Sequence, residues 1–316
     1  MGAIAALADA QGWQPPFSLR LSSEKDSDTV LRCLSLVRRI PNKRMVCLAQ
    51  WNNRPVFAKL FIDAHRARVH WQREERGVRT LWDNGILTPE VLYSGTSADG
   101  NTRVLIFERI APAQSVRDAW GQATPTARRG LLRAMVEVLA AHHRAGLRHC
   151  DLHLNNFLLS NDRIYTLDGA EVTAGTGPLG EGDSLDNLGA LFAQLTPDND
   201  PLARELFPDY VRARGWDFSA AMPEQLQHPI DRHRARRKRR LLEKVFRECS
   251  AVVSEKSATR FMACDRVYDS AALRVLLDDP DRALGNARML KRGNTCTLGE
   301  VEVDGRRLVI KRYNIK

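Results

Sequence analysis

The chain has no long hydrophobic run and no sign of an export signal. None of its 316 residues belongs to a stretch close to the roughly 18 consecutive apolar residues that a membrane-spanning helix needs. The opening Met-Gly-Ala-Ile-Ala-Ala-Leu-Ala carries no basic residue before its apolar patch, so a signal peptide is not indicated. Six cysteines are scattered at positions 33, 47, 150, 249, 264 and 296. This spacing favours reduced thiols in the cytoplasm over a disulfide framework.

Acidic residues are in the minority, and the formal net charge is +10. The densest basic cluster, Arg232–Arg240, lies on an expected helix whose apolar stripe would anchor it, formed by Leu241, Leu242, Val245 and Phe246. Such a cluster attracts nucleic acid, anionic lipid or an acidic substrate. No aromatic platform or base-reading motif accompanies it, which argues against nucleic acid. An anionic membrane surface and a phosphorylated glycolipid stay open as partners, as does an ordinary solvated helix face.

A polar loop and the strand pair after it contain the clearest chemistry. Asp151 and Asn156 lie five residues apart, and a strand-like run then delivers Asp168 with Gly169 behind it. Phosphoryl transfer uses such a set: one carboxylate orients the attacking hydroxyl, while an amide oxygen and a second carboxylate hold Mg²⁺ against the phosphates. The spacing resembles the catalytic and metal loops of the protein-kinase-like fold.

The same loop has two other interpretations. Asp and Asn are common turn formers, so a surface turn followed by a hairpin would use similar residues. The loop also offers four groups that could ligate zinc, and a catalytic zinc takes three. These are His149, Cys150, Asp151 and His153. No second ligand cluster appears elsewhere in the sequence. We expect His149 to support the loop backbone and His153 to help shape the acceptor side.

An apolar strand upstream carries a lysine. The run Val-Phe-Ala-Lys at 56–59 resembles the Val-Ala-Ile-Lys strand whose lysine pairs with ATP phosphates. A charge inside such a strand is costly without a partner, so we expect Lys59 to pair with a carboxylate of the next helix, 64–83. Glu74 and Glu75 are the candidates.

Glu75 is the preferred partner because it lies three residues before Val78 on the expected packed face. That face comprises Val69, Val78, Leu81 and Trp82. The alternative is a solvated helix with i,i+4 ion pairs such as Glu75 with Arg79.

The glycine-rich phosphate loop of protein kinases is missing. The stretch 39–44, ahead of Lys59, has no glycine, which leaves open which groups would cover a triphosphate. Further along, 104–110 is expected to be a buried strand that ends in a polar hinge. In a kinase-like fold this hinge lies over the adenine, so Glu108 and Ile110 would contact the base. A plain core strand would show the same apolar run.

Taken together, these segments resemble the lipopolysaccharide core sugar kinases, the InaA-type and Kdo/heptose kinases. The resemblance covers roughly 30–250 and rests on Phe57-Ala58-Lys59, residues 148–159, Leu167-Asp168-Gly169-Ala170 and the helix start at 183–189. It implies ATP-dependent phosphorylation of a sugar hydroxyl of the lipopolysaccharide inner core, with Mg²⁺, at the cytoplasmic face of the inner membrane. The Asp-Leu-His-x-x-Asn motif is shared with choline and aminoglycoside kinases.

The implied fold is α/β and two-lobed, with a small β-rich N-lobe over 1–110 and a helical C-lobe over 111–250. Residues 251–316 form a C-terminal extension. Within it, 302–313 echoes 50–61, because both read strand, turn, strand with a lysine. We interpret the echo either as the start of a second, truncated kinase-like lobe or as a chance hairpin at the strong turn Asp304-Gly305.

The proposed roles follow from the resemblance. Asp151 orients the acceptor hydroxyl, Asn156 and Asp168 hold Mg²⁺, and Lys59 neutralises the phosphates. The rival functions are a small-molecule phosphotransferase of the choline or aminoglycoside type and a nucleotide-binding pseudokinase with a regulatory role. The missing glycine-rich loop favours the pseudokinase, and the complete set of polar groups opposes it.

Overall fold

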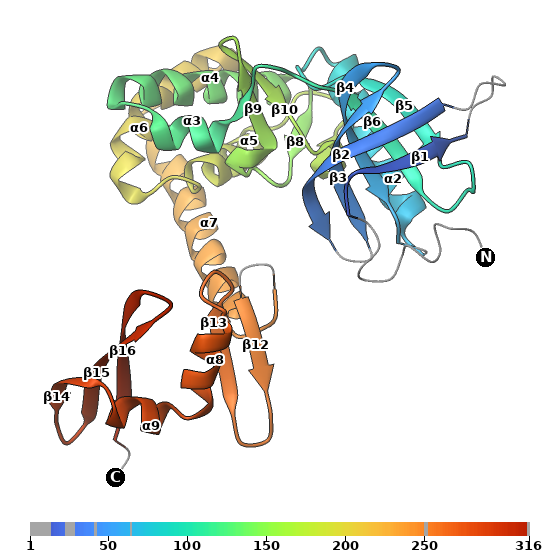
Figure 1. Cartoon of the computed structure of the whole chain (residues 1–316). Coiled ribbons are helices and arrows are strands. Elements are labelled where there is room, and N and C mark those ends of the chain that lie inside the picture. The colour runs from blue at the N-terminus through green and yellow to red at the C-terminus, as the bar shows by residue number, and fades with distance from the viewer. Residues whose placement is uncertain (1–13, 23–28, 41–42, 64, 250–251, 315–316) are drawn as a thin grey trace. The chain divides into compact units, whose positions relative to one another are not determined.

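The computed structural model describes residues 14–22, 29–40, 43–63, 65–249 and 252–314 (Figure 1). It divides into two compact units, 1–234 and 235–316. Helices and strands are both plentiful, which confirms the predicted mixed α/β class. No helix among the described residues is long and apolar enough to cross a membrane.

The first unit begins with a six-stranded sheet in the order β1-β2-β3-β4-β6-β5. All neighbouring strands are antiparallel. The strands are β1 (Phe17–Leu21), β2 (Thr29–Ile40), β3 (Arg44–Trp51), β4 (Arg54–Phe61), β5 (Val91–Thr96) and β6 (Arg103–Glu108). Alternate residues such as Met45, Ala58 and Ile106 are fully buried on one face of this curled sheet. The other face of β3, β4 and β6 is therefore free to line a pocket.

Turn chemistry fixes the β3–β4 register. Asn52 and Asn53 both have positive φ angles, 49° and 59°, which is the conformation of a two-residue hairpin turn. The predicted turn is thus confirmed. Because the strands pair without a bulge from Trp51↔Arg54 to Arg44↔Phe61, Lys59 is held at a defined position facing the pocket.

Helix α2 (Ala67–Asp83) follows the sheet and differs from its predicted packing. Its buried positions are Glu74, Gly77, Val78 and Leu81, at the i, i+3, i+4, i+7 spacing of one helix face. Val69 and Trp82 were expected on that face, but they are 62% and 55% exposed.

The rest of the first unit is mainly helical. Its helices are α3 (Val116–Gln122), α4 (Pro125–Arg144), α5 (Glu181–Phe192), α6 (Asp200–Arg214) and the beginning of α7 (Met222–Val245), inside which the division between the units falls. Helix α4 has clear signals at both ends. Thr124 caps its N-terminus by accepting a hydrogen bond from the Ala127 N–H at 3.3 Å, and Gly146 follows its end with φ +72°.

Short strands and 3₁₀ turns connect these helices. The strands are β7 (Gln114–Ser115), β8 (Leu147–His149), β9 (Phe157–Ser160), β10 (Arg163–Thr166) and β11 (Val172–Ala174). The 3₁₀ turns are η1 (Leu154–Asn156), η2 (Gly169–Glu171) and η3 (Pro197–Asn199). The apolar core beneath them contains Leu139, Phe157, Leu188, Phe207 and Tyr210.

The described part of the second unit, considered by itself, contains the last part of α7, a hairpin, two short helices and a three-stranded sheet. The elements are β12 (Val252–Lys256), β13 (Phe261–Asp265), α8 (Ala271–Asp278), α9 (Pro280–Gly285), β14 (Arg288–Arg292), β15 (Cys296–Val303) and β16 (Arg306–Tyr313). Asp304 and Gly305 form the predicted turn, with φ 51° and 71°. The hairpin of this unit is formed by β12 and β13, which pair antiparallel. Each of these strands buries one side chain, Val253 and Met262 respectively, which leaves little alternation to read.

The apolar residues after the basic cluster also differ from expectation. Leu241, Leu242, Val245 and Phe246 are 38–64% exposed, so the expected packing of this stripe is wrong. Two of the basic residues before it instead form ion pairs within the first unit. Arg232 bonds to Asp186, and Arg234 bonds to Asp200 at 2.5 Å.

Candidate active site

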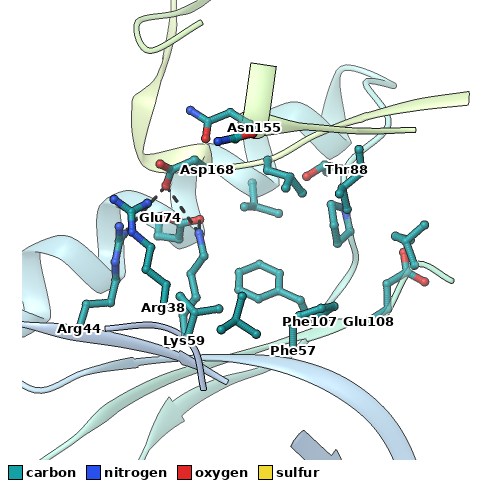
Figure 2. Close-up of a pocket in the computed structure, with 18 residues that line it drawn as sticks. Arg38, Arg44, Phe57, Lys59, Glu74, Thr88, Phe107, Glu108, Asn155 and Asp168 are labelled. Carbon is teal, nitrogen blue, oxygen red and sulfur yellow. Dashed lines mark hydrogen bonds and ion pairs between the residues drawn. The ribbon is translucent and has the colours of Figure 1, made fainter. Parts of the chain in front are cut away.

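A pocket of about 310 Å³ lies in the first unit between the sheet and the segment 155–168 (Figure 2). This volume falls at the lower end of the range of small-molecule sites, roughly 300–1,000 Å³. Five of the residues predicted from the sequence line it: Lys59, Glu108, Ile110, Asn156 and Asp168.

Asp151 is held beside this pocket by Asn156. The Asn156 side-chain amide donates hydrogen bonds to the Asp151 carbonyl oxygen at 2.9 Å and to Asp151 Oδ2 at 3.3 Å. Because both bonds use Nδ2, the amide oxygen of Asn156 stays available as a ligand atom. The Asp151 side chain is exposed, so an acceptor hydroxyl could reach it.

His149 supports the backbone of the loop that contains Asp151, as predicted. Its Nε2 lies 3.0 Å from the Leu167 carbonyl oxygen and must donate to it, while Nδ1 accepts from the Asp151 N–H at 3.3 Å. Burial lowers the pKa of His149, in keeping with the neutral ring that this pair of bonds requires. With both nitrogens engaged, His149 has no lone pair left for a metal.

Helix α5 fixes the strand that precedes the loop. Asn187 Nδ2 donates to the His149 carbonyl oxygen at 3.0 Å, and Asp186 accepts from Arg148 at 2.5 Å. The helix start at 183–189, which the sequence singled out, therefore positions β8 and through it Asp151.

Asp168 follows β10 in a left-handed backbone conformation, with φ and ψ both 60°. Asp and Asn tolerate this region better than most residues, but strain of this kind concentrates at functional sites. The conformation directs the Asp168 carboxylate toward Lys59 and Glu74, as Figure 2 shows.

Lys59 pairs with Glu74, and the predicted partner, Glu75, is wrong. Lys59 Nζ donates to Glu74 Oε1 and lies 3.6 Å from Asp168 Oδ1. Glu74 is 1% exposed, whereas Glu75 forms a 3.5 Å ion pair with Arg79. The error has the same origin as the misplaced helix face: one residue along a helix rotates a side chain by about 100°.

The charges at this end of the pocket influence one another. Burial and the nearby Asp168 carboxylate raise the pKa of Glu74, against the attraction of Lys59. Burial also works to raise the pKa of Asp168, but the positive charges of Lys59 and Arg44 outweigh it and hold that pKa below its usual value. Asp168 is therefore ionised at neutral pH, as a metal ligand must be.

The residues fit a Mg²⁺ ion. Asp168 Oδ1 is buried and has no hydrogen-bond partner among the described residues, and a bound cation would satisfy it. Mg²⁺ takes oxygen ligands, typically one or two from protein side chains with the rest from phosphates and water. Asp168 and Asn156 supply that number.

A zinc site fits poorly. Within the described part of the chain, no group of three or more His, Cys, Asp or Glu side chains could hold a metal ion. His153, another candidate ligand, uses Nδ1 to accept a hydrogen bond from the Asn155 N–H at 3.3 Å.

The opposite end of the pocket is apolar. Phe57 and Phe107 lie side by side in the β4–β6 register and both face the cavity. Glu108 and Ile110 also line the pocket, and the Glu108 side chain, at the end of β6, accepts from the Glu90 N–H at 3.0 Å. One pocket thus has an apolar end and a charged end, which suits a base and its phosphates.

Two arginines in the pocket wall were not predicted from the sequence. Arg38 and Arg44, from β2 and β3, line the cavity together with Lys59. The alternation of β3 could have identified Arg44, since Arg44 and Val46 are two residues apart and Val46 pairs with Lys59. The bulge in β2 before Arg38 hides the equivalent signal there.

Comparison with known proteins identifies a family for most of this site. Residues 49–172 match the lipopolysaccharide kinase (Kdo/WaaP) family. The match includes Lys59, Asp151 and Asp168, and it leaves Arg38 and Arg44 outside. Among curated proteins no match was found.

Proposed function

Since residues 49–172 belong to the lipopolysaccharide kinase (Kdo/WaaP) family, whose members are kinases acting on sugar hydroxyls, we propose that this chain phosphorylates a sugar hydroxyl of the lipopolysaccharide inner core, with ATP as donor and Mg²⁺ as cofactor. One observation carries the proposal: Lys59, Glu74 and Asp168 meet at the charged end of the same pocket that Asn156 lines.

Each residue has a defined task in this proposal. Lys59, oriented by Glu74, neutralises phosphate oxygens. Asp168 and the amide oxygen of Asn156 hold Mg²⁺, which when bound offsets charge on the phosphates. Asp151 accepts a hydrogen bond from the acceptor hydroxyl and orients its oxygen for attack, which is the work of a positioned carboxylate. Phe57 and Phe107 provide apolar walls for the base.

The proposal includes a protein-kinase-like arrangement of the chain. The sheet and α2 form an N-lobe that ends near 110, and the helical part forms a C-lobe that ends near 250. The base would contact the hinge at Glu108 and Ile110. The turns of β3–β4 and β15–β16 have similar backbone conformations. We therefore also propose that 251–316 contains part of a second kinase-like lobe.

Transfer of labelled γ-phosphate tests the proposed function. The purified protein is incubated with ATP, with or without Mg²⁺, and with one acceptor at a time: core oligosaccharide, choline or an aminoglycoside. Mg²⁺-dependent labelling of the oligosaccharide alone supports the proposal. Labelling of choline or the aminoglycoside alone would make the chain a small-molecule kinase, and tight ATP binding with no transfer to any acceptor would favour a pseudokinase.

The second proposal concerns the surface at which the enzyme binds its acceptor. Basic residues 236–240 are followed on the chain by the exposed Leu241, Leu242 and Phe246. Basic groups beside exposed apolar side chains suit an anionic lipid surface, where each charge contributes up to about 1 kcal/mol. We propose that this basic–apolar segment, 236–246, holds the enzyme at the cytoplasmic face of the inner membrane.

A further inference from the structure

Two arginines of the β2–β3 hairpin face the pocket next to Lys59. Arg38 lies near the end of β2, and Arg44 opens β3. In the sheet register Arg38 pairs with Val46, and Val46 pairs with Lys59. The three side chains of this row all line the pocket, so Arg38 lies two strands from Lys59 on the same face of the sheet.

Both guanidinium groups point to the charged end of the pocket and keep their hydrogen-bonding capacity. Figure 2 shows Arg38 and Arg44 extending from the sheet toward Asp168. Arg44 Nη1 lies 4.0 Å from Asp168 Oδ1, beyond hydrogen-bond distance. The Arg38 side chain has no hydrogen-bond or ion-pair partner among the residues that the structure describes.

The charge balance at this end calls for an anion. Three cations, Lys59, Arg38 and Arg44, face the two carboxylates of Glu74 and Asp168. A Mg²⁺ ion bound to Asp168 adds two more positive charges and competes for the carboxylate that Arg44 approaches. The excess positive charge matches a polyphosphate, and guanidinium groups bind phosphates through bidentate charge-assisted hydrogen bonds.

The β2–β3 hairpin comes directly before the strand of Lys59 in the chain, where protein kinases have their glycine-rich loop. A glycine-rich loop binds phosphates with backbone N–H groups because it has no side chains in the way. The stretch 39–44 has no glycine but carries Arg39, Lys43 and Arg44. Side chains can supply the donors that such a backbone would otherwise provide.

We infer that Arg38 and Arg44 form a guanidinium clamp that binds the polyphosphate of the nucleotide in place of a glycine-rich loop. The inference rests on the proposed function, because it takes ATP as the ligand of this pocket. It makes the hairpin part of the binding site and predicts that affinity depends on the phosphates far more than on the base.

Calorimetric binding to the intact chain tests the clamp with three probes: ATP, adenosine and inorganic tripolyphosphate. Arg38→Gln and Arg44→Gln are each expected to weaken ATP binding about tenfold, the scale of one lost charged hydrogen bond. The double variant is expected to lose tripolyphosphate binding and to keep its affinity for adenosine. Arg32→Gln is the matched control, since it removes one exposed charge from β2 outside the pocket and should leave all three affinities unchanged.

The remaining outcomes separate the clamp from the proposed function. If the wild type binds ATP and the double variant binds it equally well, the clamp is wrong while the kinase proposal stands. The clamp is also wrong if adenosine affinity falls as much as ATP affinity, because the arginines would then serve the fold and not the phosphates. Failure of the wild type to bind any adenine nucleotide would overturn both proposals.

Discussion

Gly77 on α2 packs directly against the backbone of Gly169, the residue after Asp168. A Cβ atom built on Gly77 would collide with the Gly169 carbonyl oxygen, and one built on Gly169 would collide with the backbone nitrogen of Val78. Glu74 lies one helical turn before this contact. The absence of two side chains therefore lets the helix that carries Glu74 approach the turn that carries Asp168.

We expect Gly77→Ala to lower the stability of the folded protein by roughly 1–3 kcal/mol, the usual cost of overpacking, and to reduce phosphoryl transfer. Gly130→Ala on α4 is the control, because a Cβ there meets nothing within 4 Å and alanine favours a helix by up to about 1 kcal/mol. Urea unfolding measures the stability of both variants. Equal stability of the two variants would show that α2 can shift away from Gly169 without cost.

Glu74 and Glu75 offer a sharp pair of variants. Glu74→Gln removes the buried charge that orients Lys59 and should lower kcat/KM by about tenfold to a hundredfold, a loss of roughly 1.4–2.7 kcal/mol of transition-state stabilisation. Glu75→Gln removes a half-buried carboxylate paired only with Arg79 in the described structure, so kcat/KM should stay near the wild-type value. The reverse order would restore the assignment made from the sequence.

The partner of Lys59 shows which parts of this site can be predicted from the sequence and which cannot. The spacing of Asp151, Asn156 and Asp168 is local, so the loop that holds them was predictable. The choice between Glu74 and Glu75 depends on the rotation of α2, which is set by the Gly77–Gly169 contact between segments more than ninety residues apart. Amphipathic periodicity could not resolve it, since the exposed Val69 and Trp82 mimic a packed face.

The two arginines escaped prediction for a related reason. Arg38, Arg39, Lys43 and Arg44 make this hairpin basic in the sequence, but a basic hairpin is interpreted as a solvated surface until its register is known. Only the pairing of Arg38 with Val46 brings it onto the face of Lys59. In the same way, the exposure of Leu241 and Phe246 depends on tertiary packing that no local pattern records.

Buried histidines should make the first unit sensitive to acid. Burial lowers the pKa of His142 to about 3 and of His143 to about 4, against about 6.5 in an unfolded chain. Their neutral forms are favoured in the folded state, so their contribution to stability is complete above pH 6.5 and declines as the pH falls toward 4.

The measurement is the free energy of unfolding of the whole chain at pH 7.5 and pH 5. At pH 5, unfolding should take up about two protons, one on each of the newly exposed His142 and His143 side chains. Burial also lowers the pKa of His149, so His149 contributes in the same direction. The same free energy of unfolding at pH 7.5 and pH 5 would contradict the neutral buried state of His142 and His143.

Membrane docking is tested by three charges of the basic–apolar segment. Changing Arg236, Lys238 and Arg240 to Gln should weaken binding to vesicles that contain anionic lipid, by up to about 1 kcal/mol for each charge. Arg232 and Arg234 are left intact because they form ion pairs with Asp186 and Asp200. Activity on a short water-soluble acceptor should hardly change.

A matched control removes the same charge elsewhere in the second unit. Lys291, Arg292 and Arg307 are exposed on β14 and β16, and their change to Gln should leave vesicle binding near the wild-type level. If both triple variants lose binding equally, attraction follows net charge and no defined docking surface exists.

The most direct test of the kinase assignment compares the wild type with Asp151→Asn. Transfer of γ-phosphate from Mg²⁺-ATP to purified core oligosaccharide is measured alongside the affinity for ATP. We predict that the variant binds ATP nearly as well as the wild type and transfers phosphate at least about a hundredfold more slowly, the scale of a positioned acid–base group. Transfer by Asp151→Asn at the wild-type rate would contradict the account.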